Sequence, residues 1–369
     1  MSAPPFTDTR HTTPLMAKPV SSSTQREVLI GQSREALRQL MGRLGEPAFR
    51  AEQLYHWLYV RCERDWDSMT NLAKPFRQRL ADTCAIGTLT PDTIQQSQDG
   101  TRKYLFRLSD GQVVESVLMH FQERDTYAVC LSTQVGCAVD CSFCATGKLG
   151  FKRNLSVSEI VEQYLFVQHE SEKEVRNVVF MGQGEPLLNL PNVLPAVHLL
   201  NEAAEVGMRR MTISTSGIVP QIYTLAQEAL PITLAVSLHA PNDAIRGQLM
   251  PINRKWPLAE LMPALHHYVE KTHRRLTIEY ILIDGLNDQA AQARELGKLL
   301  HGLRCNVNLI PYNPIHQQLP GAPMDYRRSR PSAVDRFRQI VSDYGKKVTV
   351  RLERGADIDA ACGQLANRL

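Results

Sequence analysis

The chain has 369 residues, 43% of them hydrophobic and 22% charged, with a formal net charge of +4 at pH 7. This length suits one large domain and one small one, and the composition is that of an ordinary globular protein. No apolar run reaches the roughly 20 residues that span a bilayer, and the first 25 residues lack a secretory signal pattern. Eight cysteines, three of them clustered, do not suggest a disulfide scaffold, so we expect a reducing, cytoplasmic location. The mild positive charge permits an anionic partner but does not demonstrate one.

The N-terminal part is predicted to be a disordered tail followed by a small helical module. Residues 1–30 are rich in Pro, Ser and Thr and have few large apolar groups to bury. Within residues 31–92, helical periodicity predicts helices at about 34–44, 48–58 and 74–83. Eight arginines are expected on the exposed faces of this module: Arg34, Arg38, Arg43, Arg50, Arg61, Arg64, Arg77 and Arg79. Such a face can simply be solvated, or it can contact RNA, because phosphate attraction needs clustered cations on one side.

A β-hairpin linker is predicted for residues 93–122. Two alternating segments, Tyr104–Leu108 and Val113–Leu118, flank Asp110-Gly111, which is a strong turn signal. Glu115 lies on the second strand among valines, and this pattern alone favours a position on the solvent face.

From residue 123 to residue 356, short apolar strands alternate with amphipathic helices. Strands are expected at Tyr127–Ser132, Asn177–Phe180, Met211–Ser214, Ile232–Ser237, Leu276–Ile283 and Asn306–Pro311. Helices are expected after Ser156, which forms a capping box with Glu159, and at Asn192–Ala204, Val219–Ala229, Leu258–Lys271 and Gln289–Leu300. Repeated βα units imply a parallel sheet, open or closed into a barrel, with ligands at the C-terminal ends of the strands.

Three cysteines follow the first of these strands at C-x3-C-x2-C spacing: Cys137, Cys141 and Cys144. A zinc site usually takes four ligands from two pairs. Three thiolates on one short loop instead suit three corners of a cubane iron–sulfur cluster, with one iron left open for a substrate or cofactor. The spacing is typical of radical S-adenosylmethionine (SAM) enzymes.

Other polar residues follow the later strands. Gly184 and Glu185 lie in a Gly-Gln-Gly-Glu-Pro loop, where glycines let the backbone approach a ligand and a carboxylate can hold an ammonium group or ribose hydroxyls. Ser214, Ser237, His239 and Asn313 also lie at predicted strand ends. Taken singly, each of these could merely close a strand or cap the next helix.

Two further cysteines lie outside the clustered three. Cys130 lies in the first strand, and Cys362 lies in a segment of small residues close to the C-terminus. Either can be an inert, buried small hydrophobe, as we expect for Cys62, Cys84 and Cys305. A thiol in a loop rich in Gly and Ala can instead act as a thiolate nucleophile.

Several longer motifs resemble the RlmN/Cfr family of radical SAM enzymes, and its RlmN branch most closely. They are Cys130-Leu-Ser-Thr-Gln-Val-Gly-Cys137, Phe151-Lys-Arg-Asn-Leu155, Ser214-Thr-Ser-Gly-Ile-Val-Pro220, Ser237-Leu-His-Ala-Pro-Asn-Asp243, Ile278-Glu-Tyr280 and Arg354-Gly-Ala-Asp-Ile-Asp-Ala-Ala-Cys-Gly-Gln-Leu365. The resemblance implies an α/β fold, a partial (β/α)6 TIM-like barrel. It assigns residues 31–92 to an RNA-binding accessory domain, 123–356 to the radical SAM core and 357–369 to a segment carrying a methyl-accepting cysteine.

The activity implied by this resemblance is methylation of C2 of an adenine in the peptidyl-transferase loop of 23S rRNA, and of the adenine 3′ to the tRNA anticodon. Two SAM molecules are used. Cys362 takes a methyl group from one; a [4Fe–4S] cluster on Cys137, Cys141 and Cys144 cleaves the other to a 5′-deoxyadenosyl radical. The radical formed on the methyl group adds to the adenine, Glu115 removes the C2 proton, and Cys130 releases the product by forming a disulfide with Cys362.

The resemblance also implies SAM contacts at Gly184, Glu185, Ser214, Ser237, Leu238, His239 and Asn313. An electron donor such as flavodoxin or ferredoxin, a monomeric state and the absence of a membrane partner are expected with it. Two features depart from the family pattern: Gln183 replaces the usual Met of Gly-Met-Gly-Glu-Pro, and the segment between Glu115 and Cys130 is two residues longer.

Two other functions stay open. A Cfr-like enzyme would use the same residues to methylate C8 of adenine, and no motif separates the two positions. A zinc-stabilised RNA-binding protein without catalysis would use Cys130 as a fourth ligand, but it would leave Cys362 and the Gly-Gln-Gly-Glu-Pro loop without a role.

Overall fold

The structure, a computed structural model, describes residues 26–121, 125–315 and 325–367. Of the predicted disordered tail, residues 1–25 lie outside the described residues, and residues 26–30 are described. Its last residues include β1 (Glu27–Val28), which pairs in parallel with β2 (Cys84–Ala85). This pairing joins the two ends of the N-terminal module.

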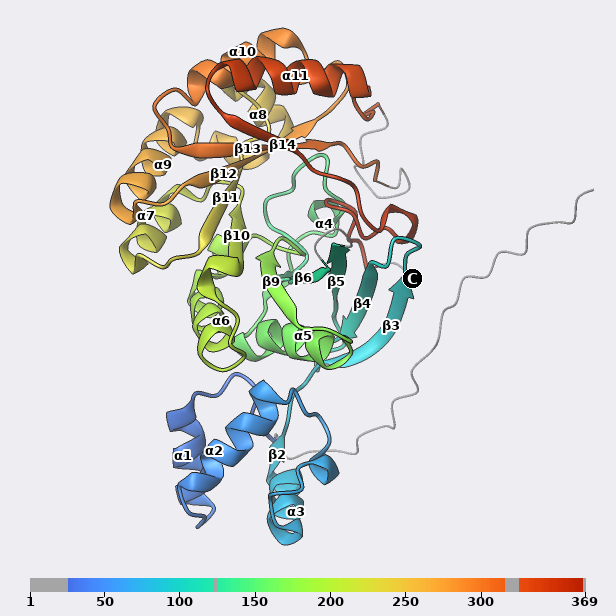
Figure 1. The fold of residues 1–369 in the computed structure, drawn as a ribbon, viewed down its shortest axis with the longest axis vertical. Helices are drawn as coiled ribbons and strands as arrows, with labels where there is room; N and C mark the ends of the chain where they lie inside the picture. Colours follow the sequence, from blue (N-terminus) through green and yellow to red (C-terminus); the bar gives the residue numbers. More distant parts are fainter. Residues whose placement is uncertain (1–25, 122–124, 316–324, 368–369) are drawn as a thin grey trace, which may run out of the picture.

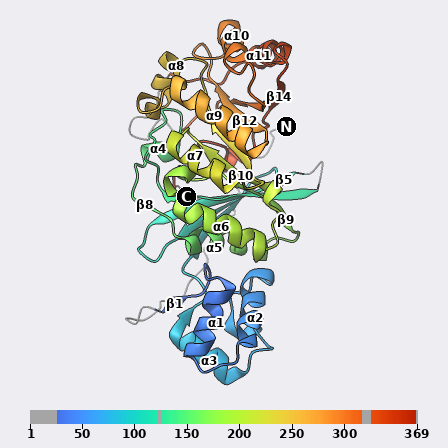
Figure 2. The ribbon, with the colours of Figure 1, turned by 90° about the vertical axis from the view of Figure 1, so that its left-hand side faces the viewer.

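The N-terminal module contains α1 (Arg34–Arg43), α2 (Phe49–Tyr55), a π-helical turn (His56–Val60) and α3 (Lys74–Thr83). The side chain of Ser33 caps α1 by accepting a hydrogen bond from the amide of Ala36 at 3.2 Å. These helices form a separate layer at one end of the elongated molecule, below the large sheet in Figure 1 and Figure 2.

The predicted arginine face of this module is only partly correct. Arg77 is 7% exposed, and its Nη1 donates to the carbonyl oxygens of Trp66, at 3.1 Å, and Asp67. Helical spacing alone suggested an exposed Arg77, but the segment that contains Trp66 and Asp67 folds over that face of α3. Other arginines form ion pairs within the module: Arg34 and Arg38 with Glu52, Arg43 with Glu27, and Arg79 with Glu46. Much of the cationic charge is thus already compensated locally.

The main sheet has ten strands in the order β14-β13-β12-β11-β10-β9-β6-β5-β4-β3. The six predicted parallel strands are all present, as β6 (Thr126–Cys130), β9 (Val175–Phe180), β10 (Met211–Thr215), β11 (Thr233–Ser237), β12 (Leu276–Leu282) and β13 (Cys305–Pro311). A further parallel strand, β14 (Lys347–Val350), pairs with β13 and was not predicted. The sheet curves into the partial barrel visible in Figure 1.

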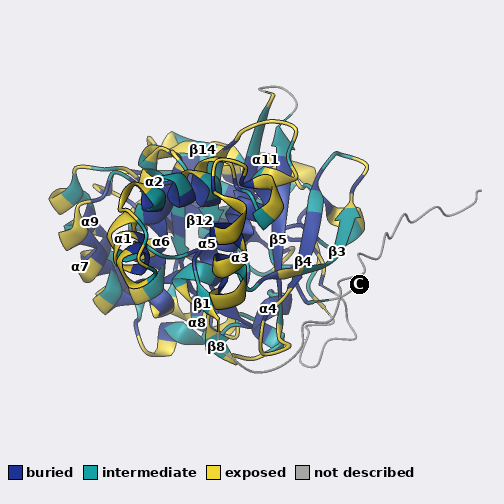
Figure 3. Ribbon diagram, turned by 90° about the horizontal axis from the view of Figure 1, so that it is seen from below, coloured by how far each residue is buried: buried dark blue, intermediate teal, exposed yellow. Residues whose placement is uncertain are grey.

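Helices cover the outside of the parallel strands. The predicted ones are α5 (Val157–His169), α6 (Leu190–Glu202), α7 (Val219–Glu228), α9 (Leu258–Thr272) and α10 (Ala290–Leu299). In α5 the capping box forms as expected, with the Glu159 amide donating to Ser156 Oγ and the Ser156 amide to Glu159 Oε2. Buried helix faces turn toward the strands in Figure 3. Three helices were not predicted: α4 (Ala145–Lys148), α8 (Asp243–Leu249) and α11 (Pro331–Asp343).

The predicted hairpin is β4 (Arg102–Arg107) and β5 (Val113–Phe121), preceded by β3 (Thr90–Gln96). All three extend the barrel sheet, because β5 pairs antiparallel with β6 and brings Val117 opposite Cys130. Side chains alternate along a strand, so Glu115 shares a face with Val117. Glu115 is 0% exposed, and the expectation of a solvent-facing side chain is wrong.

Within the described residues, no helix is both long and apolar enough to cross a membrane.

Candidate active site

The three clustered cysteines lie on the loop after β6 and line one cavity of about 160 Å³. Burial raises the pKa of Cys137 to about 12, and it also raises the pKa values of Cys141 and Cys144. The neighbouring thiols raise these pKa values further, because like charges would have to share one site. Three thiolates can coexist here only beside a compensating positive group, as metal ligands do.

An iron–sulfur cubane suits this arrangement better than a single metal ion. In the described ranges, no three His, Cys, Asp or Glu side chains converge as ligands of one ion. The corners of a cubane bind different irons, so its cysteine sulfurs need not point at one position. An all-sulfur donor set that shares one cavity wall fits such a cluster.

The glycine-rich loop after β9 forms another wall of this cavity. Gly184 has a φ of +100°, and a Cβ there would lie 2.5 Å from the Cβ of Gln134. At Gly182, a Cβ would lie 2.8 Å from the carbonyl carbon of Leu131. Both glycines are therefore required by close packing of the loop against the segment that leads to the cysteines.

Glu185 lines the same cavity and is buried. Its Oε2 accepts from the amide of Ser216 at 2.6 Å, and its Oε1 accepts from the amide of Leu187 at 3.0 Å. Burial raises the pKa of this carboxyl group, while these hydrogen bonds oppose the shift. Each oxygen keeps a lone pair, so the carboxylate can still hold a ligand ammonium group.

His239 contributes a neutral donor to this cavity, which Ser214 and Ser237 also line. Its Nδ1 accepts a hydrogen bond from the amide of Ile281 at 3.0 Å. Burial lowers the pKa of His239 to about 3, so the ring is neutral at physiological pH. Because Nδ1 is an acceptor, the single ring proton lies on Nε2. The backbone at His239 is left-handed, with a φ of +59°.

Two predicted SAM contacts do not line this cavity. Leu238 is fully buried, and its carbonyl accepts from Arg246 Nε at 3.2 Å. Asn313 lines a second cavity of about 370 Å³, where its Nδ2 donates to the carbonyl of Cys362 at 3.2 Å. The predicted contact residues thus fall into two groups, and Asn313 belongs with Cys362.

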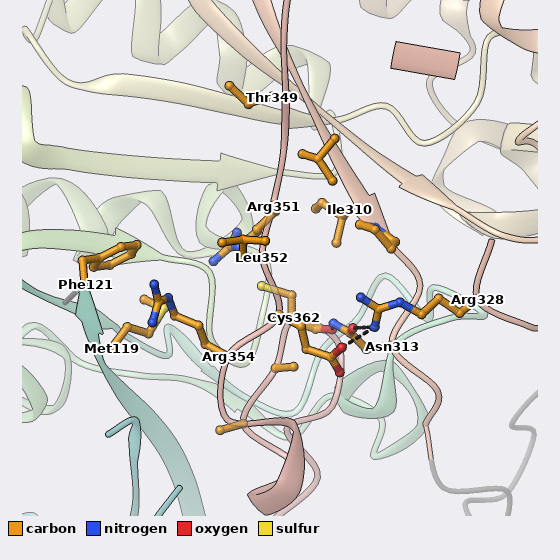
Figure 4. A pocket seen from close by; sticks show the side chains of 15 residues that line it. Met119, Phe121, Ile310, Asn313, Arg328, Thr349, Arg351, Leu352, Arg354 and Cys362 are labelled. Atoms are coloured by element: carbon orange, nitrogen blue, oxygen red, sulfur yellow. Dashed lines mark hydrogen bonds and ion pairs between the residues drawn. The ribbon is translucent and has the colours of Figure 1, made fainter. Parts of the chain in front are cut away.

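Cys362 lies between the two cavities and lines both of them. It is carried by the last part of the chain, residues 351–367, which we call the C-terminal strap. The strap is tied to α4, since the Ala145 amide donates to Gly363 O at 2.7 Å and Thr146 Oγ1 donates to Leu365 O at 2.8 Å. Figure 4 shows the Cys362 sulfur beside the Arg351 side chain at the centre of the second cavity.

Cys130, the last residue of β6, lines neither cavity. It is 7% exposed and belongs to an apolar cluster with Val117, Ala360 and Leu365. Burial raises the pKa of Cys130 to about 12; the neighbouring Cys362 thiol raises it further, and the cation of Arg351 opposes the shift. The two thiols are therefore close enough to interact electrostatically.

Glu115 is close to the strap but separated from the cavities. Its Oε1 lies 3.2 Å from Lys103 Nζ, and both side chains are almost fully buried. Its Oε2 accepts from the amide of Asn367 at 3.0 Å and from Gln183 Nε2 at 3.3 Å. Burial raises the pKa of Glu115, and Lys103 opposes the shift. The Asn367 amide of the strap thus contacts this carboxylate directly, and Glu115 is fully buried.

Sequence reasoning missed two cations of the site. Arg351 lines both cavities and a third one of about 380 Å³ at the N-terminal ends of the strands. In the sequence it was one of nine Lys and Arg residues between residues 325 and 354, with nothing to single it out. Lys103 precedes Tyr104 in an ordinary strand pattern, and only the partner on β5 reveals its role.

Comparisons with known proteins agree with this site. The radical SAM superfamily model matches residues 131–296, and the model of the ribosomal RNA large subunit methyltransferase N-terminal domain matches residues 28–86. A solved structure of a radical SAM methyltransferase from Sphaerobacter thermophilus has a TM-score of 0.88 and 44% identity, covering 93% of this chain and 100% of that chain. The fold and the cysteine-lined cavity therefore define a radical SAM enzyme.

Two curated relatives narrow this class. The "Probable dual-specificity RNA methyltransferase RlmN" of Symbiobacterium thermophilum is 50% identical over 348 residues, 93% of this chain and 92% of the relative. The protein of the same name from Synechocystis is 48% identical over 321 residues, 87% of this chain and 89% of the relative. The chain belongs to the RlmN family of radical SAM RNA methyltransferases. This family implies a [4Fe–4S] cluster, SAM and an RNA substrate.

Proposed function

We propose that the chain methylates C2 of an adenine in the peptidyl-transferase loop of 23S rRNA and of the adenine 3′ to the tRNA anticodon. Two SAM molecules are consumed per turnover. The observation that carries the proposal is the position of Cys362, which lines both the cysteine-lined cavity and the second cavity. A thiol shared by two cavities can receive a methyl group in one and present it to a base in the other.

The cysteine-lined cavity is the proposed site of SAM. Cys137, Cys141 and Cys144 would hold a [4Fe–4S] cluster, which supplies the electron for reductive cleavage of SAM when bound. Gly184, Glu185, Ser214, Ser237 and His239 would bind the SAM molecule itself. Leu238 and Asn313 would act indirectly, Leu238 through the main chain that carries Ser237 and His239, and Asn313 through its hydrogen bond to Cys362 O.

The second cavity is the proposed site of the adenine. Arg354 lies over the ring of Phe121 at 4.7 Å, and Arg328 and Arg351 line the same cavity. Aromatic and guanidinium planes stack on bases that leave an RNA helix, and cations attract the phosphates beside them. This chemistry supports an unstacked nucleotide next to Cys362.

Three residues have proposed roles in methyl transfer. Cys362 accepts the methyl group, Glu115 removes the C2 proton, and Cys130 attacks the Cys362 sulfur to release the methylated base as a disulfide forms. The common apolar cluster of Cys130 and the strap supports this pairing. Because the thiols must be reduced for the next turnover, we place the enzyme in the cytoplasm, as a monomer served by a flavodoxin or ferredoxin.

Nucleoside analysis tests the proposal. We expect 2-methyladenosine in 23S rRNA and tRNA from cells with the protein and its loss from cells without it, measured by mass spectrometry of digested RNA. Detection of 8-methyladenosine instead would show that the enzyme methylates C8 of adenine rather than C2. After anaerobic purification, metal analysis should detect iron and sulfide in the protein. Stoichiometric zinc without iron or sulfide would refute the radical mechanism.

A further inference from the structure

Gln183 stands where the sequence departs from Gly-Met-Gly-Glu-Pro, and the structure gives its side chain a partner outside the SAM cavity. It is 0% exposed and does not line the cysteine-lined cavity. Its Nε2 donates to Glu115 Oε2 at 3.3 Å and to Asn367 Oδ1 at 2.6 Å. One loop therefore serves two places, since Glu185 faces the cavity and Gln183 faces Glu115.

The orientation of this amide follows from its neighbours. A side-chain amide nitrogen carries two hydrogens, so Nε2 can donate to both oxygens at once. The flipped amide would place Gln183 Oε1 against two acceptors, Glu115 Oε2 and Asn367 Oδ1, and no hydrogen bond would form. In the observed orientation Oε1 is buried and has no hydrogen-bond partner among the described residues.

The main chains of Gln183 and Glu115 are fixed to each other by one hydroxyl group. Ser132 Oγ accepts from the Gln183 amide at 2.8 Å and donates to Glu115 O at 2.5 Å. The other carboxylate oxygen of Glu115 faces Lys103, the charged side chain that the described structure places against it. The carboxylate is thus held from three directions, by β4, by the glycine-rich loop and by the strap.

We propose that Gln183 is a positioning residue for Glu115, donating to Oε2 and so fixing the orientation of the carboxylate that removes the adenine proton. This rests on the proposed function. In the step concerned, the C2–H bond breaks heterolytically, its electron pair stays on the base and the proton moves to Glu115 Oε2.

The test compares Gln183→Met with Gln168→Met in the purified full-length enzyme carrying its cluster. Methionine keeps the length of the side chain but can neither donate to a carboxylate nor accept strongly. Gln168 lies on α5, bonds the Val175 amide and does not contact Glu115. For Gln183→Met we expect the acid limb of the pH–rate profile to move up by about one pH unit, because the carboxylate loses a donor.

The second readout is the covalent protein–RNA adduct, resolved on denaturing gels. Slower proton removal should raise its amount in Gln183→Met roughly tenfold, since a general base contributes a large part of this step's rate. Gln183→Glu, which keeps the size and adds a like charge, should move the acid limb further in the same direction. It also keeps the proposal testable if Gln183→Met unfolds on heating before the assay temperature.

Two results separate this inference from the proposed function. If wild type forms 2-methyladenosine while Gln183→Met matches Gln168→Met in pH profile and adduct, the positioning role is refuted and the proposed function stands. If wild type forms no 2-methyladenosine, the proposed function fails and the inference fails with it.

Discussion

The cysteine-lined cavity and the C-terminal strap meet at Cys362, yet different contacts hold them. Most polar residues of the cavity lie at the C-terminal ends of parallel strands or in the loops that follow them, so the sheet sets their positions. The strap continues from β14, with the Arg351 amide donating to Leu309 O at 2.8 Å, and is then held by contacts distant in sequence: Asp357 accepts from Ser97 Oγ at 2.6 Å, and Gln364 Nε2 donates to Pro314 O at 3.0 Å. The sheet thus positions the cavity, whereas long-range side-chain contacts position the strap.

Cys362→Ala is the sharpest way to separate the two regions. We expect RNA methylation to fall by at least about 10³-fold, because this substitution removes the thiol that we propose carries the transferred carbon. Iron and sulfide content should match wild type, since the cavity cysteines are unchanged. Cys305→Ala, another nearly buried cysteine, is the control and should retain methylation. If the Cys362→Ala variant still methylates RNA, the proposed role of the strap thiol in methyl transfer is refuted.

Cys130→Ala should block the last step, release of the methylated base from Cys362. The adduct between Cys362 and RNA forms but is not resolved, so it should accumulate and appear as a protein band shifted by RNA. Product release should fall about 10²-fold or more, because no other described thiol belongs to the apolar cluster around the strap. Cys84→Ala is the matched control, and full activity without adduct in Cys130→Ala would refute the resolving role.

Lys103→Met tests how the charge next to Glu115 affects catalysis, and a smaller effect is expected. Burial raises the pKa of Glu115 and Lys103 opposes this, so removal of the cation should raise that pKa further. A base acts only when deprotonated, so the acid limb of the pH–rate profile should move upward, with about tenfold slower methylation near neutral pH. Lys271→Met, on α9, is the control. An unchanged profile would show that Glu115 is not the titrating base.

The smallest effects are expected in the N-terminal module. Arg38 and Glu52 form a half-exposed ion pair, so Arg38→Gln should lower the free energy of unfolding by less than about 1 kcal/mol. Arg77→Gln removes a buried donor to two carbonyls and should cost about 1–3 kcal/mol, measured by urea denaturation. If Arg38→Gln weakens RNA binding without changing stability, the exposed face takes part in recognition.

Much of the fold was predictable because periodicity is local. The six parallel strands and five helices were each encoded in a few residues, and the capping box of Ser156 and Glu159 fixed one helix start. Helix α11 was not predicted, although Val334, Phe337 and Val341 follow helical spacing. Strand β14 is short and partly exposed, so only its pairing with β13 defines it.

The sequence by itself determined the cavity, since residues that end parallel strands must meet at one edge of the sheet. Which face of β5 turns inward was decided only by the tertiary structure, because an alternating strand fits either side until its partner is known. Pairing with β6 buries Glu115 between Lys103, Gln183 and Asn367. The proximity of Cys130 and Cys362 likewise depends on the strap's path, which long-range hydrogen bonds set and local patterns do not encode.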